Sequence, residues 1–265
     1  MICLIDGPVA TDHRDLAGTK IRDIQGKNKT GCSYLDSLAC LHGTYVAGIL
    51  SARRGSVAPA ICPGCTLMVR PIFTECTGSK CTMPTATAEE LASAINDAIA
   101  AGANVINVSA ALGQSSPQSE RRVQDALDYA SRAGVLVVAA SGNQGAVGSS
   151  PVTRHPWVIA VIGCDLQGRP TAESNMGRSI GTRGLAAPAE NITSLGPGDK
   201  PLTSSGTSAA APFVTGTIAL LWSEFRGVGA ARIRQAVTQS ENRSRRSIAP
   251  PVLDAWTARE ALAQR

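Results

Sequence analysis

The amino-acid sequence predicts an α/β fold of three layers, in which helices cover both faces of a mainly parallel sheet. Short, almost continuously apolar runs alternate with longer amphipathic segments, as in strand–helix–strand units whose strands are buried on both faces. Apolar residues make up 43% of the 265 residues but aromatic residues only 3%, and there are 26 glycines. The core must therefore consist of small aliphatic side chains, which suits helices packed closely on a sheet.

The predicted elements follow one another along a single domain, residues 1–265. Strands are expected at residues 1–6, 65–73, 104–110, 135–142 and 157–165, and helices at 42–54, 87–103 and 120–134. Thr87 is a suitable N-cap for the second helix, and Gly102 and Gly134 are suitable stops for the second and third. No low-complexity linker or internal repeat divides the chain.

Charge and hydropathy exclude several classes of partner. The net charge is +5, with 25 basic and 20 acidic residues spread along the chain. The densest basic patch, Arg243, Arg245 and Arg246 in ENRSRRS, has no interleaved aromatic residues, so neither nucleic acid nor a membrane surface is expected as a partner. No apolar run is long enough to span a membrane. The first residues lack the features of a signal peptide, which predicts a cytoplasmic location unless a leader has been removed.

Eight cysteines bear on the compartment. Cys32/Cys40, Cys62/Cys65 and Cys76/Cys81 form short-range pairs in loop-like sequence, whereas Cys3 and Cys164 lie inside apolar runs and are expected to be buried. Disulfides in the three pairs would indicate an oxidising, extracellular or periplasmic compartment. Free thiols are the second possibility. The third is a zinc site of Cys32, Cys40, Cys62 and Cys65, although their spacing matches zinc sites poorly.

Three reactive residue types stand at the ends of predicted strands or the beginnings of helices. Asp6 ends the first strand, His42 stands in CLHGTYVAGIL, and Ser208 stands in SGTSAAAP. In such sheets, functional residues lie in the loops at the carboxyl ends of the parallel strands. An acid, an imidazole and a hydroxyl activate a serine nucleophile: the imidazole takes the serine proton and the acid holds the imidazole. Asn143, in AASGNQG, offers an amide donor for the oxyanion, with the Ser208 backbone N–H as the second donor.

The sequences around these residues resemble a known family. IDGPV, HGTYVAGI and SGTSAAAPFVTG are similar to the Asp, His and Ser motifs of the subtilases, the subtilisin-like serine proteases. The chain order Asp, His, Ser is that of subtilisin and differs from those of chymotrypsin and the α/β-hydrolases. The resemblance covers nearly the whole chain, up to a final helix in VLDAWTAREAL. It implies a sheet of about seven strands and a serine endopeptidase that works through an acyl-enzyme intermediate.

Three details look most like the cyanobactin maturation proteases, which cut leader and recognition sequences from ribosomally made precursor peptides. They are IDGPV with Pro8 two residues after Asp6, RPIF at residues 70–73, and GANVINVSAALGQ at residues 102–114. By the same resemblance, the substrate-binding walls are Ser109, Ala110, Ala111, Leu112 and Gly113 on one side and Ala140, Ser141 and Gly142 on the other. Walls of this composition predict an uncharged, moderately apolar side chain before the cut.

The remaining expectations concern ligands and other functions. Residues 51–66 contain no carboxylate, so neither a calcium loop nor another metal or cofactor is expected. The alternatives to a maturation protease are a general secreted subtilase and a catalytically dead binding module. A nucleotide-binding protein is excluded because IDGPVATDH lacks a glycine-rich phosphate loop. His13 and His155 are expected at the surface. Asp12 and Asp15 are interpreted as loop carboxylates, with substrate contact as the alternative.

Overall fold

A seven-stranded sheet forms the centre of the computed structural model, which describes residues 1–58, 60–78, 85–110, 116–239 and 247–264. The strand order is β2-β3-β1-β4-β5-β6-β7, and all neighbours run parallel. The strands are β1 (Ile2–Asp6), β2 (Lys20–Asp23), β3 (Thr66–Pro71), β4 (Val105–Val108), β5 (Leu136–Ala140), β6 (Val158–Cys164) and β7 (Leu185–Pro188). An antiparallel hairpin of β8 (Ile192–Gly196) and β9 (Lys200–Ser204) stands apart from this sheet.

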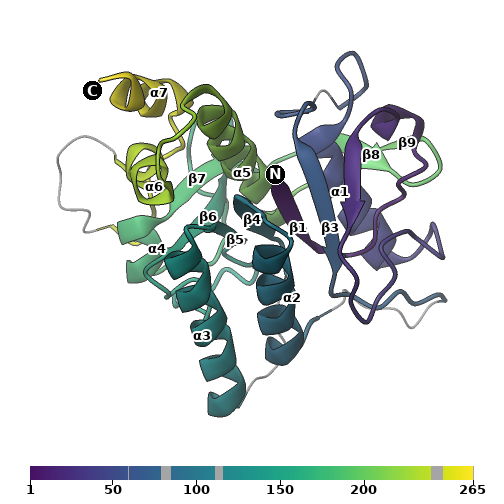
Figure 1. Ribbon diagram of the computed structural model, residues 1–265, viewed down its shortest axis with the longest axis horizontal. Helices are drawn as coiled ribbons and strands as arrows, with labels where there is room; N and C mark the ends of the chain where they lie inside the picture. The colour runs from purple at the N-terminus through teal and green to yellow at the C-terminus, as the bar shows by residue number, and fades with distance from the viewer. Residues whose placement is uncertain (59, 79–84, 111–115, 240–246, 265) are drawn as a thin grey trace.

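Helices cover both faces of the sheet (Figure 1). They are α1 (Leu38–Ser51), α2 (Ala88–Ala100), α3 (Pro117–Ala133), α4 (Arg178–Arg183), α5 (Thr207–Glu224), α6 (Ala230–Thr238) and α7 (Ala255–Ala263). Alternate residues of β1 divide the core. Ile2 and Leu4 belong to the part that contains α1 and α5, whereas Cys3 and Ile5 belong to the part that contains α2 and α3. This alternation follows from the two-residue period of a strand, and the predicted fold class is confirmed.

The helix signals in the sequence are confirmed where they are strongest. The Thr87 side chain accepts a hydrogen bond from the Glu90 N–H at the start of α2, and Gly134 adopts the left-handed conformation after α3. Two helix starts were wrong. The first helix, α1, begins at Leu38, four residues before His42, because the Ser37 side chain caps it by accepting from the Cys40 N–H. The third, α3, begins at Pro117 instead of residue 120, because the Ser116 side chain caps it. Six short elements, β2, β7, β8, β9, α4 and α6, were not predicted.

The three cysteine pairs differ in whether they form disulfides. Cys32 and Cys40 form a disulfide, so their thiolates are not available for the zinc site considered from the sequence. Cys62 and Cys65 are free thiols. Cys76 is disulfide-bonded, whereas Cys81 lies outside the described residues. The prediction of burial for Cys3 and Cys164 is confirmed, because their exposures are 0% and 1%.

Two histidines predicted at the surface are buried instead. His13 is 3% exposed because its Nδ1 accepts a hydrogen bond from the Asp15 N–H and caps a short 3-10 helix, Arg14–Leu16. His155 is 4% exposed and lies beside Asp128, with 3.2 Å between Nε2 and Oδ1. Neither of these polar contacts leaves a mark on the hydrophobic pattern.

Asp12 and Asp15 also differ from each other. Asp12 is exposed, as expected of a loop carboxylate. Asp15 is buried, and its Oδ1 accepts a hydrogen bond from Arg53 Nε at 2.6 Å. This ion pair gives Asp15 a partner within the fold, so substrate contact is not needed to explain it.

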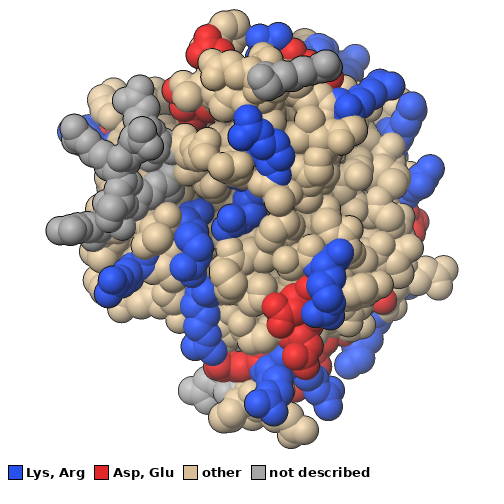
Figure 2. Space-filling view, turned by 60° about the vertical axis from the view of Figure 1, so that its left-hand side comes forward, with Lys and Arg blue, Asp and Glu red and all other residues tan. Residues whose placement is uncertain are grey.

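The surface shows dispersed charge. On the face in Figure 2, lysine and arginine side chains stand in several separate groups, with acidic side chains beside some of them. The predicted basic patch at Arg243, Arg245 and Arg246 lies outside the described residues. Within the part of the chain that the structure describes, no helix has the length and apolar character needed to cross a membrane.

Candidate active site

Asp6 and His42 form a close pair at the carboxyl end of β1. Asp6 is fully buried, and its Oδ1 lies 2.6 Å from His42 Nδ1 and 2.6 Å from the Gly7 backbone nitrogen. A buried carboxylate accepts hydrogen bonds, so it holds the proton of neutral His42 on Nδ1 and leaves Nε2 as an acceptor. The His42 side chain is 17% exposed. Its free nitrogen can therefore take a proton from a group in the adjoining cavity.

Gly43, the residue after His42, lies where there is no space for a side chain. A Cβ at this position would lie 2.3 Å from the carbonyl oxygen of Pro8 and 2.5 Å from that of Gly7. Because both contacts are to backbone, no side-chain movement would relieve them. The absence of a side chain lets α1 approach the loop after β1 and brings His42 within reach of Asp6.

Ser208 is the second residue of α5 and lies on the same cavity as His42. The cavity has a volume of about 410 Å³ and is lined by Leu38, Leu41, His42, Tyr45, Asn143, Leu202, Ser204, Ser205, Ser208 and Ala209. Ser208 follows Gly206, whose φ of 123° lies in the region that favours glycine. Ala209, Ala210 and Ala211 are at most 1% exposed, so this end of α5 packs closely on the sheet and fixes the position of Ser208.

Asn143 is held by a residue that the sequence did not single out. Its Oδ1 accepts hydrogen bonds from the backbone N–H and the hydroxyl of Thr207, each at 2.9 Å. The same hydroxyl accepts from the Gly142 N–H at 3.2 Å. Since the amide oxygen is engaged, the Nδ2 group is left as a donor, and it makes no hydrogen bond with any residue that the structure describes. Thr207 thus orients Asn143 from the residue next to Ser208.

The predicted substrate-binding walls follow two adjacent parallel strands. Ser109 and Ala110 come directly after β4; Ala140 ends β5, and Ser141 and Gly142 follow it. Residues 105–108 of β4 pair with residues 136–139 of β5, so the two segments leave the same edge of the sheet side by side. Ser109 and Ser141 are 4% and 5% exposed. Ala111, Leu112 and Gly113 lie outside the described residues.

The environment of His42 raises its pKa above the ordinary value of 6.5. Burial alone lowers the pKa, because it disfavours the charged imidazolium. The negative charge of Asp6 and the hydrogen bond with it act in the opposite direction and together outweigh burial. The pair is therefore arranged to stabilise an imidazolium that forms when His42 accepts a proton.

The apolar wall of the cavity was not predicted. Leu38 and Leu41 come from the first turns of α1, and Leu202 comes from β9. The Leu-x-x-Leu spacing just before His42 is a helical signal that could have pointed to α1 starting earlier. Leu202 had no such signal, because the hairpin is brought to the cavity by packing of β8 against α1.

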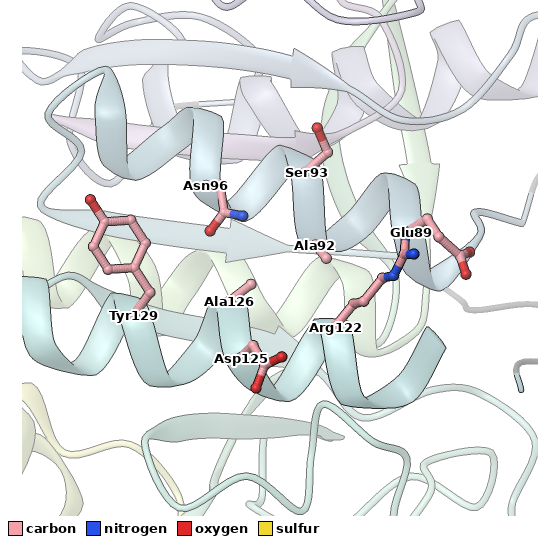
Figure 3. A pocket seen from close by; sticks show the side chains of 8 residues that line it. All are labelled: Glu89, Ala92, Ser93, Asn96, Arg122, Asp125, Ala126 and Tyr129. Atoms are coloured by element: carbon pink, nitrogen blue, oxygen red, sulfur yellow. The ribbon is translucent and has the colours of Figure 1, made fainter. Parts of the chain in front are cut away.

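A second hollow of about 510 Å³ lies between α2 and α3, away from these residues (Figure 3). Its polar lining includes Glu89, Arg122, Asp125 and Tyr129, with Glu89 and Arg122 near one another at one end. It contains neither histidine nor cysteine. One group among the described residues has metal-ligating types close together, Cys32, Cys40 and Glu75, but the first two are joined as a disulfide.

Comparison with known proteins gives the family of the chain. Residues 1–253 match the subtilase family. The chain belongs to the subtilase family. This subtilase is 32% identical over 245 residues to the thermophilic serine proteinase of Bacillus sp. (strain AK1), covering 91% of the chain and 56% of the relative. It is also 32% identical over 201 residues to the thermostable alkaline protease of Halalkalibacterium halodurans, covering 75% of the chain and 52% of the relative. The chain spans about half the length of these relatives.

Solved structures show the same fold. The protease domain of PatA superposes with a TM-score of 0.85 at 31% identity, over 99% of this subtilase and 94% of that chain. The prenylagaramide maturation protease PagA superposes with a TM-score of 0.81 at 27% identity, over 98% and 93%. PatA is a patellamide maturation protease. The resemblance to cyanobactin maturation proteases predicted from the sequence is confirmed.

Proposed function

We propose that this subtilase is a serine endopeptidase whose catalytic residues are Asp6, His42 and Ser208. The observation that carries the proposal is the 2.6 Å contact of Asp6 with His42, together with the presence of His42, Ser208 and Asn143 on one cavity. Its membership of the subtilase family supports the same assignment.

The geometry supports a two-step reaction. Ser208 Oγ attacks the carbonyl carbon of the peptide bond while His42 Nε2 takes its proton, and Asp6 stabilises the resulting imidazolium. The Nδ2 group of Asn143 and the Ser208 backbone N–H donate to the oxyanion of the tetrahedral intermediate. His42 then gives the proton to the leaving amine, which departs and leaves an acyl-enzyme. Water attacks the acyl-enzyme with His42 again as the base, and the acid product is released.

The substrate in this proposal is a peptide with an uncharged, moderately apolar residue before the cut. The described part of the wall, Ser109, Ala110 and Ala140 to Gly142, carries no charged side chain. An extended peptide pairs its backbone with such strand-end segments, so selectivity comes from the side-chain pocket. Cleavage of a peptide library should show small or apolar residues at that position, and a profile dominated by Lys, Arg, Asp or Glu would contradict the proposed pocket.

Within this activity, the role favoured is the maturation of a ribosomally made precursor peptide. The likeness to PatA and PagA, which are maturation proteases, supports it. Digestion of an unfolded protein mixture distinguishes this role from general degradation. A maturation protease should release a few products that share one cleavage motif, whereas cuts at most accessible apolar positions would indicate a degradative enzyme. The Ser208→Ala variant, treated in parallel, identifies products that arise from contaminating proteases.

A further inference from the structure

Cys62 and Cys65 form a second reactive cluster, separate from the catalytic residues. They stand in the C-P-G-C segment between α1 and β3. Cys62 is 1% exposed, and both its backbone N–H and its thiol donate to the carbonyl oxygen of Leu50, at 3.0 and 3.3 Å. Cys65 is half-buried. The buried thiol is thus fixed to the end of α1 while its neighbour reaches the surface.

The backbone places the two thiols where a disulfide can form. The Cys65 N–H donates to the Cys62 carbonyl oxygen at 3.0 Å, which closes a β-turn with Pro63 and Gly64 at its centre. The first and last Cα atoms of such a turn lie within about 7 Å, close to the range of about 4.4–6.8 Å that disulfides span. Bond formation therefore needs only local movement.

The proximity of the two thiols makes them chemically unequal. The neighbouring Cys62 thiol lowers the pKa of Cys65 to about 7, although burial acts in the opposite direction. The pKa of Cys62 is raised, first by the neighbouring Cys65 thiol and then by burial. A thiolate is the attacking form in disulfide exchange. Cys65 is accordingly the residue that attacks first, and Cys62 is the residue that reacts second.

Cys65 also opens on a pocket of its own. The lining of a hollow of about 430 Å³ includes Cys65 together with Gly64, Thr66, Trp222, Ser223 and Arg226. The Trp222 indole N–H donates to the Val228 carbonyl oxygen at 2.8 Å, which fixes the ring. Arg226 makes no ion pair with any residue that the structure describes, so its guanidinium is available for an anionic ligand. The pocket thus combines a nucleophile, an aromatic wall and a cation.

We propose that Cys62 and Cys65 form a thiol–disulfide exchange site that accepts an anionic low-molecular-weight disulfide in this pocket. The Cys65 thiolate attacks one sulfur of the disulfide RSSR, forming a mixed disulfide and releasing one RS⁻. Cys62 then gives its proton to a released thiolate, and its sulfur attacks Cys65 Sγ and displaces the second RS⁻. Two protein thiols are oxidised to one disulfide, and RSSR is reduced to two RSH. The new bond closes the turn between α1 and β3.

Exchange with glutathione disulfide, an anionic probe, tests the site. The whole chain is incubated near neutral pH, blocked with N-ethylmaleimide at intervals, and analysed by intact mass and peptide mapping. The wild type should lose two hydrogens, with the new bond mapped to Cys62 and Cys65. Cys62→Ser should stop at a glutathione adduct on Cys65, and Cys65→Ser should react at least roughly 10-fold more slowly. Because mass is the readout, the result does not depend on proteolytic activity.

The controls separate the proposal from general thiol oxidation. Cys164→Ser removes another buried free thiol and should react like the wild type. In the wild type itself, samples blocked at early times should carry glutathione on Cys65 and not on Cys62. This measurement needs no variant, so the test stays valid if a variant folds poorly. An unmodified Cys65, or an adduct that never resolves in the wild type, would overturn the exchange site. Arg226→Gln should slow the reaction with glutathione disulfide but not the reaction with the cationic disulfide cystamine. Equal effects on the two reactions would overturn the proposal that the ligand is anionic.

Discussion

Asp6 and His42 set the acid–base chemistry of the candidate site at the scale of single residues. Burial of His42 favours its neutral form, whereas the charge of Asp6 and their hydrogen bond favour the imidazolium, and the second influence is stronger. His42 acts as a base only when neutral. The rate of a reaction that depends on it must therefore fall as the pH drops through a pKa that lies above 6.5.

Replacing Asp6 tests this balance. In Asp6→Asn the charge is lost and burial remains, so the pKa of His42 should fall and the acidic limb of kcat/KM should move to lower pH. The plateau should fall by about 10⁴-fold, the size of the effect in chymotrypsin-type triads. The measurement is kcat/KM on a library-derived peptide across the pH range. An acidic limb that stays at the wild-type pH would show that His42 does not control it.

The Thr207–Asn143 contact gives a second prediction. Asn143→Ala should lower kcat by roughly 10²–10³-fold with little change in KM, as for the corresponding donor in subtilisin. Thr207→Val removes the hydroxyl that bonds the amide oxygen but keeps the backbone N–H, so the loss should be smaller, about 10-fold. Thr207→Ser keeps the hydroxyl and serves as the matched control. Equal rates for the Val and Ser variants would show that the hydroxyl does not position Asn143.

The sequence singled out the candidate catalytic residues but not the contact that positions Asn143. Asp6, His42, Ser208 and Asn143 stand at element ends in motifs with fixed neighbours, which is why they were predicted. Thr207 is one of several small polar residues in its motif, and its contact with Asn143 joins residues 64 positions apart. The polar contact between His13 and the Asp15 N–H is local instead, because the two residues are two positions apart. Neither type of contact changes the hydrophobic periodicity from which the elements were predicted.

At the scale of elements, the approach of α1 to β1 depends on Gly43. Gly43→Ala places a Cβ against two backbone carbonyl oxygens, so either the helix or the loop must move. The free energy of unfolding should fall by about 1–3 kcal/mol, and activity should fall further because His42 moves away from Asp6. Thermal or denaturant unfolding and peptide cleavage measure the two effects. Gly148→Ala, where a Cβ meets nothing within 4 Å, is the control and should leave both unchanged.

The Cys32–Cys40 disulfide ties the loop before α1 to its first turn. The bond closes a short loop, with a sequence separation of 8. In a chain-entropy account such a cross-link stabilises the folded state by about 2–3 kcal/mol. Cys32→Ser/Cys40→Ser should lower the unfolding midpoint accordingly, whereas Cys65→Ser, which removes a free thiol, should not. An unchanged midpoint in the double variant would mean that the loop is held by its other contacts.

Elements with a strong apolar pattern were predicted, and weakly patterned ones were not. β1, β3, β4, β5 and β6 are nearly continuous apolar runs, and α2 and α3 have clear caps. The hairpin of β8 and β9 is short and rich in serine and threonine, and it is held in place by packing of β8 against α1. Its position depends on tertiary contacts, so Leu202 could not be placed at the cavity from the sequence.

At the scale of the whole molecule, the candidate site is assembled from distant parts of one sheet. Asp6 is the last residue of β1, and Asn143 follows the carboxyl end of β5. His42 and Ser208 come from α1 and α5, which share one part of the core. The fold class and this convergence follow from the parallel strand order, because loops at the carboxyl ends of such strands meet. The site therefore exists only when the sheet and both helices are in place.

Labelling with a fluorophosphonate probe shows whether Ser208 is the nucleophile. The probe reacts covalently with a serine activated by a neighbouring base, and mass spectrometry of the labelled peptides locates the adduct. The wild type should carry one adduct, on Ser208, and Ser208→Ala should carry none, while Ser205→Ala, on the same cavity, should label normally. A folded wild type that does not react, or an adduct that persists in Ser208→Ala, would show that Ser208 is not the nucleophile.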